Sequence, residues 1–213
     1  MSLFGFDPDS VFARIQASPG PVRVPSLSQS MATGGLGFAT VSLASFGVWA
    51  WGGRWLHANL GELGLYAACA VVLIAGGGAV FHPLVIGSNR CRRFYGLFAL
   101  AFFLYAGVWT GSYFSLRGKS GEWLGSLLGP AIMGMTFASA FTTPGAVTKV
   151  VLLLFASHSL GYFLGEYLYD TLSGIPGMLL WGGVYGFCFG AGIGGTLHGC
   201  QSGIRRRLPE SIA

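Results

Sequence analysis

The amino-acid sequence predicts an all-α integral membrane protein of six transmembrane helices. Hydrophobic residues occupy 53% of the 213 positions and charged residues only 9%, with a mean hydropathy of +0.63. A soluble domain carries about 25% charged residues, so this chain has too few to cover a surface that faces water. Several apolar runs approach the length of about 20 residues that crosses the hydrocarbon core of a bilayer. Glycine, at 36 residues and without a collagen-like period, suits helices that pack backbone against backbone.

Composition divides the chain into three regions. We expect a polar N-terminal extension at residues 1–33, a six-span membrane domain at 34–204 and a basic C-terminal tail at 205–213. The extension lacks the continuous apolar core that a signal peptide requires. Within it, Phe12 to Ile15 fits a short amphipathic helix with Asp9 or Ser10 as its capping residue.

The six spans follow from the apolar runs and the polar links between them. They are expected at residues 35–56, 63–86, 94–115, 123–141, 147–169 and 177–199. Tryptophans end the first span, which places that end at a membrane interface. Paired in order, the spans form three hairpins in one orientation, at about 35–86, 94–141 and 147–200.

An internal repeat supports the hairpin interpretation. Gly47-Val48-Trp49 and Gly61-Glu62 recur sixty residues later as Gly107-Val108-Trp109 and Gly121-Glu122. The third unit is more diverged and aligns with the second at an offset of 54, which matches Gly161 to a glycine. Repeats in the same orientation imply an axis along the membrane normal, unlike the inverted repeats of many transporters. The alternative is six unrelated helices of similar composition.

The basic residues indicate how the spans are oriented. Of the twelve Lys and Arg residues, only Arg54, Arg117 and Lys119 fall on the side opposite the chain ends. The positive-inside rule therefore places both termini on the cytoplasmic side, or on the matrix or stromal side of an organelle. This pattern predicts a bacterial inner membrane or an organellar inner membrane. The four cysteines show neither metal-site spacing nor a disulfide framework.

The sixth span carries a row of glycines, Gly182, Gly186, Gly190 and Gly194. A spacing of four residues places them on one helix face, where the backbone of another helix can approach closely. The row therefore predicts a packing face of the glycine-zipper type. It does not say whether the partner helix belongs to this chain.

The fifth span carries a stripe of ionisable and polar side chains, His158, Tyr162, Glu166 and Asp170. Such groups are costly inside a bilayer and usually face a bundle interior or water, so they are candidates for an ion or proton path. The alternative places Glu166 and Asp170 at the interface, where water satisfies them, and leaves His158 bonded to a neighbouring carbonyl.

Two further histidines, His82 and His198, end the second and sixth spans. A histidine with small neighbours can ligate the metal of haem or chlorophyll, because glycine leaves room for a macrocycle. Histidine at an interface is also common without a ligand. His82 and His198 are therefore the candidate cofactor ligands, with no metal site expected elsewhere.

No catalytic motif of the G-x-S-x-G, H-E-x-x-H or P-loop type occurs, so we do not expect an enzyme. Two functional classes remain. The first is a non-catalytic subunit that packs in a larger membrane complex, with the bilayer, other subunits or itself as partners and no nucleic acid. The alternative is a transporter or pore for a small solute, an ion or protons, built on the threefold hairpin repeat. A transporter needs polar groups near the midplane, and spans one to four offer few beyond hydroxyls, which favours the subunit.

Overall fold

The computed structural model describes residues 4–17 and 21–208, and the regular structure in these ranges is helical. The α-helices are α1 (Pro8–Ala17), α2 (Leu27–Phe81), α3 (Arg90–Leu116), α4 (Gly118–Ala140), α5 (Val147–Leu172), α6 (Gly174–Cys200) and α7 (Ser202–Arg207). Two 3₁₀ helices, η1 (His82–Leu84) and η2 (Pro144–Ala146), precede α3 and α5. The all-α prediction is confirmed. In the described residues, five helices are long and apolar enough to cross a membrane.

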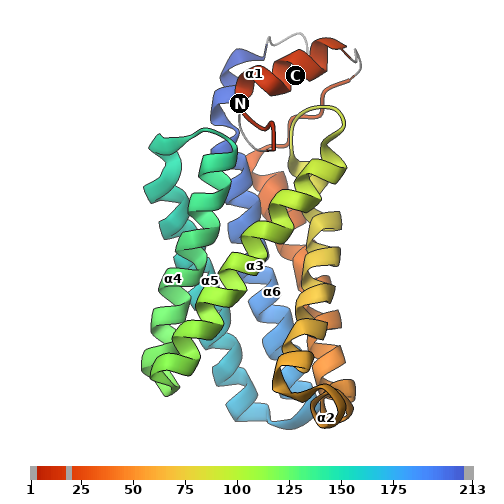
Figure 1. The fold of residues 1–213 in the computed structure, drawn as a ribbon, viewed down its shortest axis with the longest axis vertical. Coiled ribbons are helices and arrows are strands. Elements are labelled where there is room, and N and C mark those ends of the chain that lie inside the picture. Colours follow the sequence, from red (N-terminus) through yellow and green to blue (C-terminus); the bar gives the residue numbers. More distant parts are fainter. Residues whose placement is uncertain (1–3, 18–20, 209–213) are drawn as a thin grey trace.

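The first of these helices, α2, covers the first two predicted spans and folds back on itself. Gly61 interrupts it with φ 70° and ψ −176°, a conformation open to glycine because it has no Cβ. The first arm (residues 27–60) and the second arm (62–81) then run antiparallel (Figure 1). Ser45 Oγ donates to Cys69 O at 3.2 Å, and a Cβ at Gly76 would lie 2.6 Å from Val41. The two arms therefore pack as a hairpin.

The next two hairpins turn with a similar backbone. Arg117 has φ 57° and ψ 161°, and Ser173 has φ 51° and ψ 172°. The amide of each donates to the carbonyl four residues earlier at 2.7 Å, so each closes one helix before the next begins. A glycine with positive φ follows in both, at Gly118 and Gly174. The fourth predicted span, at 123–141, thus begins too late: α4 begins at Gly118 and contains Gly121, whereas the matching Gly61 is itself the turn.

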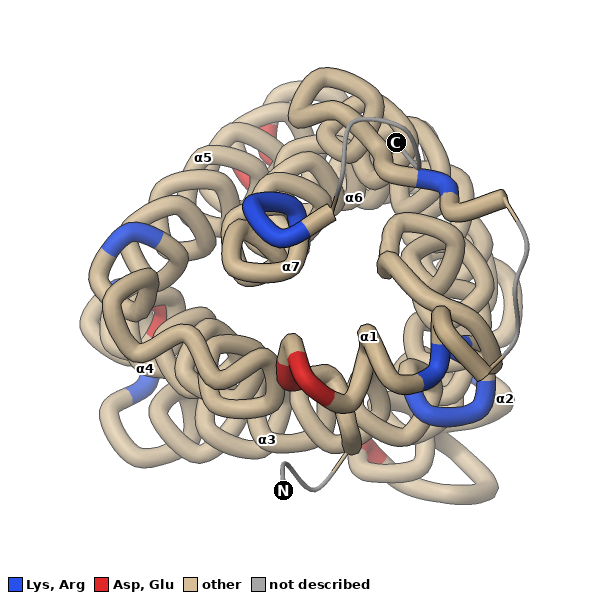
Figure 2. Tube along the Cα trace, turned by 90° about the horizontal axis from the view of Figure 1, so that it is seen from above, with Lys and Arg blue, Asp and Glu red and all other residues tan. Residues whose placement is uncertain are grey.

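The helices close into a ring. α6 packs against α2 and α5, α4 against α3 and α5, and α3 returns to α2. Seen from above, they surround a central axis, with α1 and α7 lying over one end (Figure 2). Both termini lie at that end, and the turns of the hairpins lie at the other (Figure 1).

The predicted glycine row makes the closest approach to the backbone of a neighbouring helix. A Cβ at Gly190 would lie 2.3 Å from Gly34 O, and one at Gly194 would lie 2.1 Å from Ser30 O. A Cβ at Gly186 would collide with Ser42, and one at Gly182, a helical turn further along, would collide with Phe46. The glycine row therefore faces the first arm of α2, within this chain.

Phenylalanines fill the axis in the half of the bundle nearest the termini. Phe38, Phe81, Phe98 and Phe189 are fully buried and come from α2, α3 and α6. Their rings pack pairwise, with centroids 5.5 Å apart for Phe38–Phe81 and for Phe81–Phe98. Tilted aromatic pairs at this spacing are favourable beyond the area they bury. This half of the bundle is a packed apolar core.

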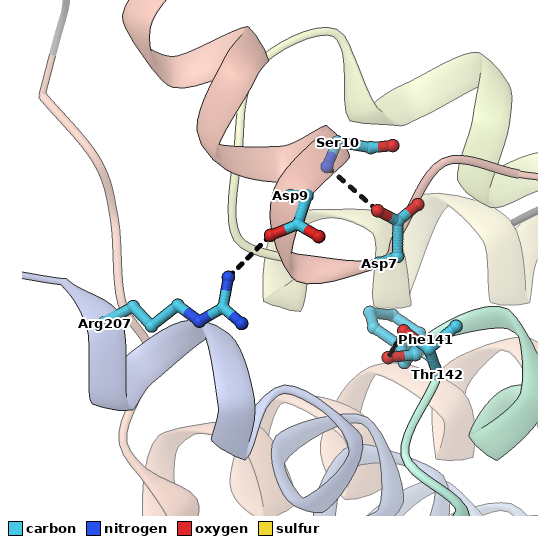
Figure 3. Close-up of polar contacts among 6 residues, drawn as sticks. All are labelled: Asp7, Asp9, Ser10, Phe141, Thr142 and Arg207. Atoms are coloured by element: carbon cyan, nitrogen blue, oxygen red, sulfur yellow. Dashed lines mark hydrogen bonds and ion pairs between the residues drawn. The ribbon is translucent and has the colours of Figure 1, made fainter. Parts of the chain in front are cut away.

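The N-terminal residues cap this end of the bundle. Phe6 is buried and stacks on Phe141 with ring centroids 5.1 Å apart. The predicted short helix forms as α1, but its cap is Asp7, whose Oδ1 accepts from Ser10 N at 3.0 Å (Figure 3). Asp7 takes this role in place of Asp9 or Ser10 because Pro8, with no N–H, suits the first helical position. Asp9 instead pairs with Arg207 at 2.6 Å.

A buried glutamine that the sequence analysis missed joins the end of α6 to the link after α2. Gln201 Oε1 accepts from Ile86 N at 2.6 Å, and its Nε2 donates to Leu84 O at 3.0 Å and to Leu197 O at 2.9 Å. Backbone groups that would otherwise be buried without partners are thus satisfied.

We predict that Gly190→Ala lowers the free energy of unfolding by about 1–3 kcal/mol, because the added methyl collides with the Gly34 carbonyl. The control is Gly107→Ala in α3, where a Cβ would meet nothing within 4 Å. It should be neutral or stabilising by up to about 1 kcal/mol, because alanine favours the helix. Unfolding titrations in detergent measure both. Equal effects would mean that the glycine row does not hold two helices together.

Candidate functional site

A central cavity of about 340 Å³ lies in the half of the bundle nearest the turns. Its walls come from α2, α3, α4, α5 and α6, so residues far apart in the sequence meet there. The phenylalanine core lies between the cavity and the end that α1 caps. The cavity therefore belongs to one end of the molecule only.

Aromatic side chains dominate the cavity wall. Ten of the described lining residues are aromatic: Phe46, Trp49, Tyr66, Phe102, Tyr105, Trp109, Tyr113, Tyr162, Trp181 and Tyr185. Several form a continuous belt. Trp181 lies 6.4 Å from Trp49 and 5.5 Å from Tyr162 between ring centroids, and Tyr162 lies 5.5 Å from Trp109. The belt thus joins all three hairpins across the cavity.

Two carboxylates interrupt the aromatic wall. Glu122, in the first turns of α4, and Glu166, near the end of α5, both line the cavity. Lys119 joins them: its Nζ lies 3.1 Å from Glu122 Oε2 and donates to Glu166 Oε1. The lysine side chain is 64% exposed, whereas the glutamates are 12% and 20% exposed. The carboxylates thus line the cavity, and the exposed lysine, which is not among the lining residues, contacts them from outside.

A buried hydrogen-bonded triad forms the floor of the cavity. The Tyr105 hydroxyl lies 2.8 Å from His158 Nε2 and 2.7 Å from the Tyr185 hydroxyl, which joins α3, α5 and α6. His158 is fully buried, and its ring lies parallel to that of Tyr162 at 5.9 Å. Its Nδ1 has no hydrogen-bond partner among the described residues. The triad is therefore a polar network with one unused position.

Only part of the predicted stripe of polar side chains on α5 contributes to this site. Tyr162 and Glu166 line the cavity, and His158 lies behind its tyrosines. Asp170 is exposed and does not line it. The structure thus brings three of the four candidates together.

The two other predicted histidines lie away from the cavity. His82 Nδ1 lies 3.2 Å from Gly78 O and 3.0 Å from Ala79 O, where it caps its own helix. His198 has a buried Nδ1 with no partner among the described residues. Neither lines the cavity, so the described cavity residues include no histidine that could hold haem or chlorophyll there.

Sequence reasoning missed most of the cavity because it looked for charged groups within single spans. Tyr105 and Tyr185 supply hydroxyls from spans that look apolar, and Lys119 reaches a carboxylate 47 residues away. The internal repeat carried part of the signal, since Trp49, Trp109 and Glu122 all belong to it and all line the cavity.

Comparison with protein-family models, curated proteins and solved structures found no match. The fold and the cavity therefore define the class on their own: an all-helical bundle, compatible with a membrane, that encloses an aromatic cavity.

We predict that Tyr105→Phe lowers the free energy of unfolding by about 1–3 kcal/mol, because it removes two hydrogen bonds and leaves His158 Nε2 buried without a partner. Tyr113→Phe is the control, since that ring also lines the cavity and its hydroxyl bonds to none of the described residues. Unfolding titrations in detergent compare the two. A loss no larger than that of the control would contradict the triad.

Proposed function

We propose that this chain is an integral membrane transporter that carries a small solute through its central cavity. The cavity is the observation that carries this proposal. Its volume of about 340 Å³ lies within the range of small-molecule sites, which are mostly apolar and contain a few placed polar groups. The polar groups of this cavity are Glu122 and Glu166, toward the turn end, and the tyrosine–histidine floor, which lies deeper in the bundle.

Three tandem hairpins, giving six spans, form the scaffold of the proposed transporter. Its turns fall at Gly61, Arg117 and Ser173, which are 56 residues apart. Positions 109 and 125 are in contact in the second hairpin, and positions 165 and 181 in the third, again at an offset of 56, with tryptophan and glycine exchanged between the two helices. This spacing supports the repeat and replaces the offset of 54 expected for the third unit.

The first hairpin matches the second at a different offset. Ser45 contacts Cys69 in the first, and Tyr105 contacts Gly129 in the second, which is the offset of sixty seen in the sequence. The turn at Gly61 falls four residues beyond the equivalent of Arg117 at that offset. Relative to these contacts, the first arm of α2 is therefore one helical turn longer than its equivalent in the second hairpin, and the second arm is one turn shorter.

The proposed orientation follows from charge and places the cavity on the outer side. The basic residues gather at the end where the termini lie, which the positive-inside rule assigns to the cytoplasm or its organellar equivalent. The cavity then faces outward, and the phenylalanine core closes the inner side. This arrangement suits the outward-facing state of a carrier that alternates between two states.

Two surfaces that a partner subunit would use, the glycine row and the N-terminal extension, pack within this chain. The glycine row already packs on the first arm of α2, and Phe6 and Val11 pack on the bundle of their own chain. Membership of a larger complex stays a prediction that these contacts do not support.

We predict that a cysteine in the cavity reacts from both sides of the membrane, because a carrier exposes its site to each side in turn. Thr110→Cys, which lines the cavity, is placed in a chain that lacks all four native cysteines, Cys69, Cys91, Cys188 and Cys200. An impermeant thiol reagent is applied to right-side-out and to inside-out vesicles. Reaction should occur in both, and faster from the outer side.

Two further single-cysteine chains serve as controls under the same conditions. Native Cys91, exposed at the terminal end, should react only from the inner side, and Ala101→Cys, buried on the same helix as Thr110, should react from neither. Reaction of Thr110→Cys from the outer side alone would indicate a static binding site. Reaction from neither side would refute the cavity.

A further inference from the structure

We propose that the solute is an organic cation, and that Lys119 occupies its charge site while the cavity is empty. This inference rests on the transport function proposed above, since it names the substrate class and the regulation of the same cavity.

The charges of the cavity favour a cation. Glu122 and Glu166 come from different helices and converge on the cavity with most of each side chain buried. Buried charges are normally paired, because removing them from water is costly. Lys119 is the cation that pairs with them among the described residues, so the three groups together keep a formal charge of −1. A ligand that brings a positive charge completes the pairing.

The aromatic belt favours an organic cation over a metal ion. A quaternary or alkylated ammonium binds over ring faces, at about 6 Å or less from the ring centroid. Trp49, Trp109 and Trp181 are placed around the cavity to provide such rings. Calcium or magnesium would require several oxygen ligands at about 2.0–2.6 Å. The described residues contain no group of three or more His, Cys, Asp or Glu side chains that could hold a metal ion.

Lys119 already makes the contacts expected of such a ligand. Its ammonium bridges the two carboxylates and lies 5.8 Å from the centroid of the Phe163 ring. Yet 64% of its side chain is exposed, and it lies in the first turn of α4, so it can swing into solvent without unpacking the bundle. An arriving organic cation therefore displaces the Lys119 ammonium from the two carboxylates. The lysine keeps the carboxylates paired in the empty cavity and lowers the affinity for weak cations.

The test measures binding of choline to the purified full-length chain by isothermal titration calorimetry. Its neutral analogue 3,3-dimethylbutan-1-ol has the same shape without the charge. Choline should bind at least about tenfold more tightly than the analogue, because the analogue loses the attraction of the ammonium charge to the carboxylates and to the ring faces. Equal affinities would mean that the cavity selects for apolar shape, and would overturn the cation assignment.

Three substitutions then separate the roles of the charged groups. Glu122→Gln or Glu166→Gln should weaken choline binding by about tenfold or more, whereas Asp170→Asn, at an exposed carboxylate outside the cavity, should leave it unchanged. Lys119→Ala should tighten choline binding by about two- to fivefold, because ion pairs of so exposed a side chain are weak. Weaker binding by Lys119→Ala would mean that the lysine contacts the solute directly, and would overturn its role as a competitor.

These outcomes are separable from failure of the transport proposal. Lys119→Ala changes an exposed residue, so it reports on the site even if a glutamate variant does not fold. If choline does not bind while Thr110→Cys still reacts from both sides, the cation assignment is wrong and the carrier stands. If Thr110→Cys reacts from neither side, the transport proposal is wrong, whatever the choline measurements show.

Discussion

The backbone contact between α6 and the first arm of α2 is the interaction on which the rest of the structure depends. It joins the last hairpin to the first and so converts three hairpins in sequence into a closed ring. Any side chain at Gly190 or Gly194 would meet a carbonyl oxygen of the other helix at 2.1–2.3 Å. Since lipid is as apolar as leucine, helices in a membrane gain from close packing more than from burial, and glycine permits the closest approach.

Ring closure has different consequences in the two halves of the bundle. Toward the termini, large rings such as Phe38 and Phe189 fill the axis, and Phe6, just before α1, covers the end by stacking on Phe141. Toward the turns, the rings are mostly tryptophan and tyrosine, which lie around the axis and leave about 340 Å³ between them. The asymmetry gives the molecule a closed side and a cavity side, which is the arrangement that alternating access requires of one of its states.

The sequence was sufficient for features that depend on local spacing. Apolar runs placed the helices, and the i, i+4 glycine row on α6 identified a packing face. The spacing of the glycines could not identify the helix that packs against them, because 156 residues separate Gly190 from Gly34. For the same reason, the cavity could not be predicted from the sequence. The hydrogen bond between Tyr105 and Tyr185 spans 80 residues, and a tyrosine in an apolar run looks like a core residue until its hydroxyl finds a partner. The cap of α1 was missed for a local reason, since Pro8 shifts the helix start to follow Asp7.

Uptake of radiolabelled choline into proteoliposomes tests the central claim, that this cavity carries an organic cation, most directly. The account predicts saturable uptake by the wild-type chain, competed by tetramethylammonium. It also predicts that uptake falls to the level of empty liposomes in Ala106→Trp, where an indole fills a cavity wall position on α3. Uptake equal to that of empty liposomes in the wild type, or undiminished uptake in Ala106→Trp, would contradict the account.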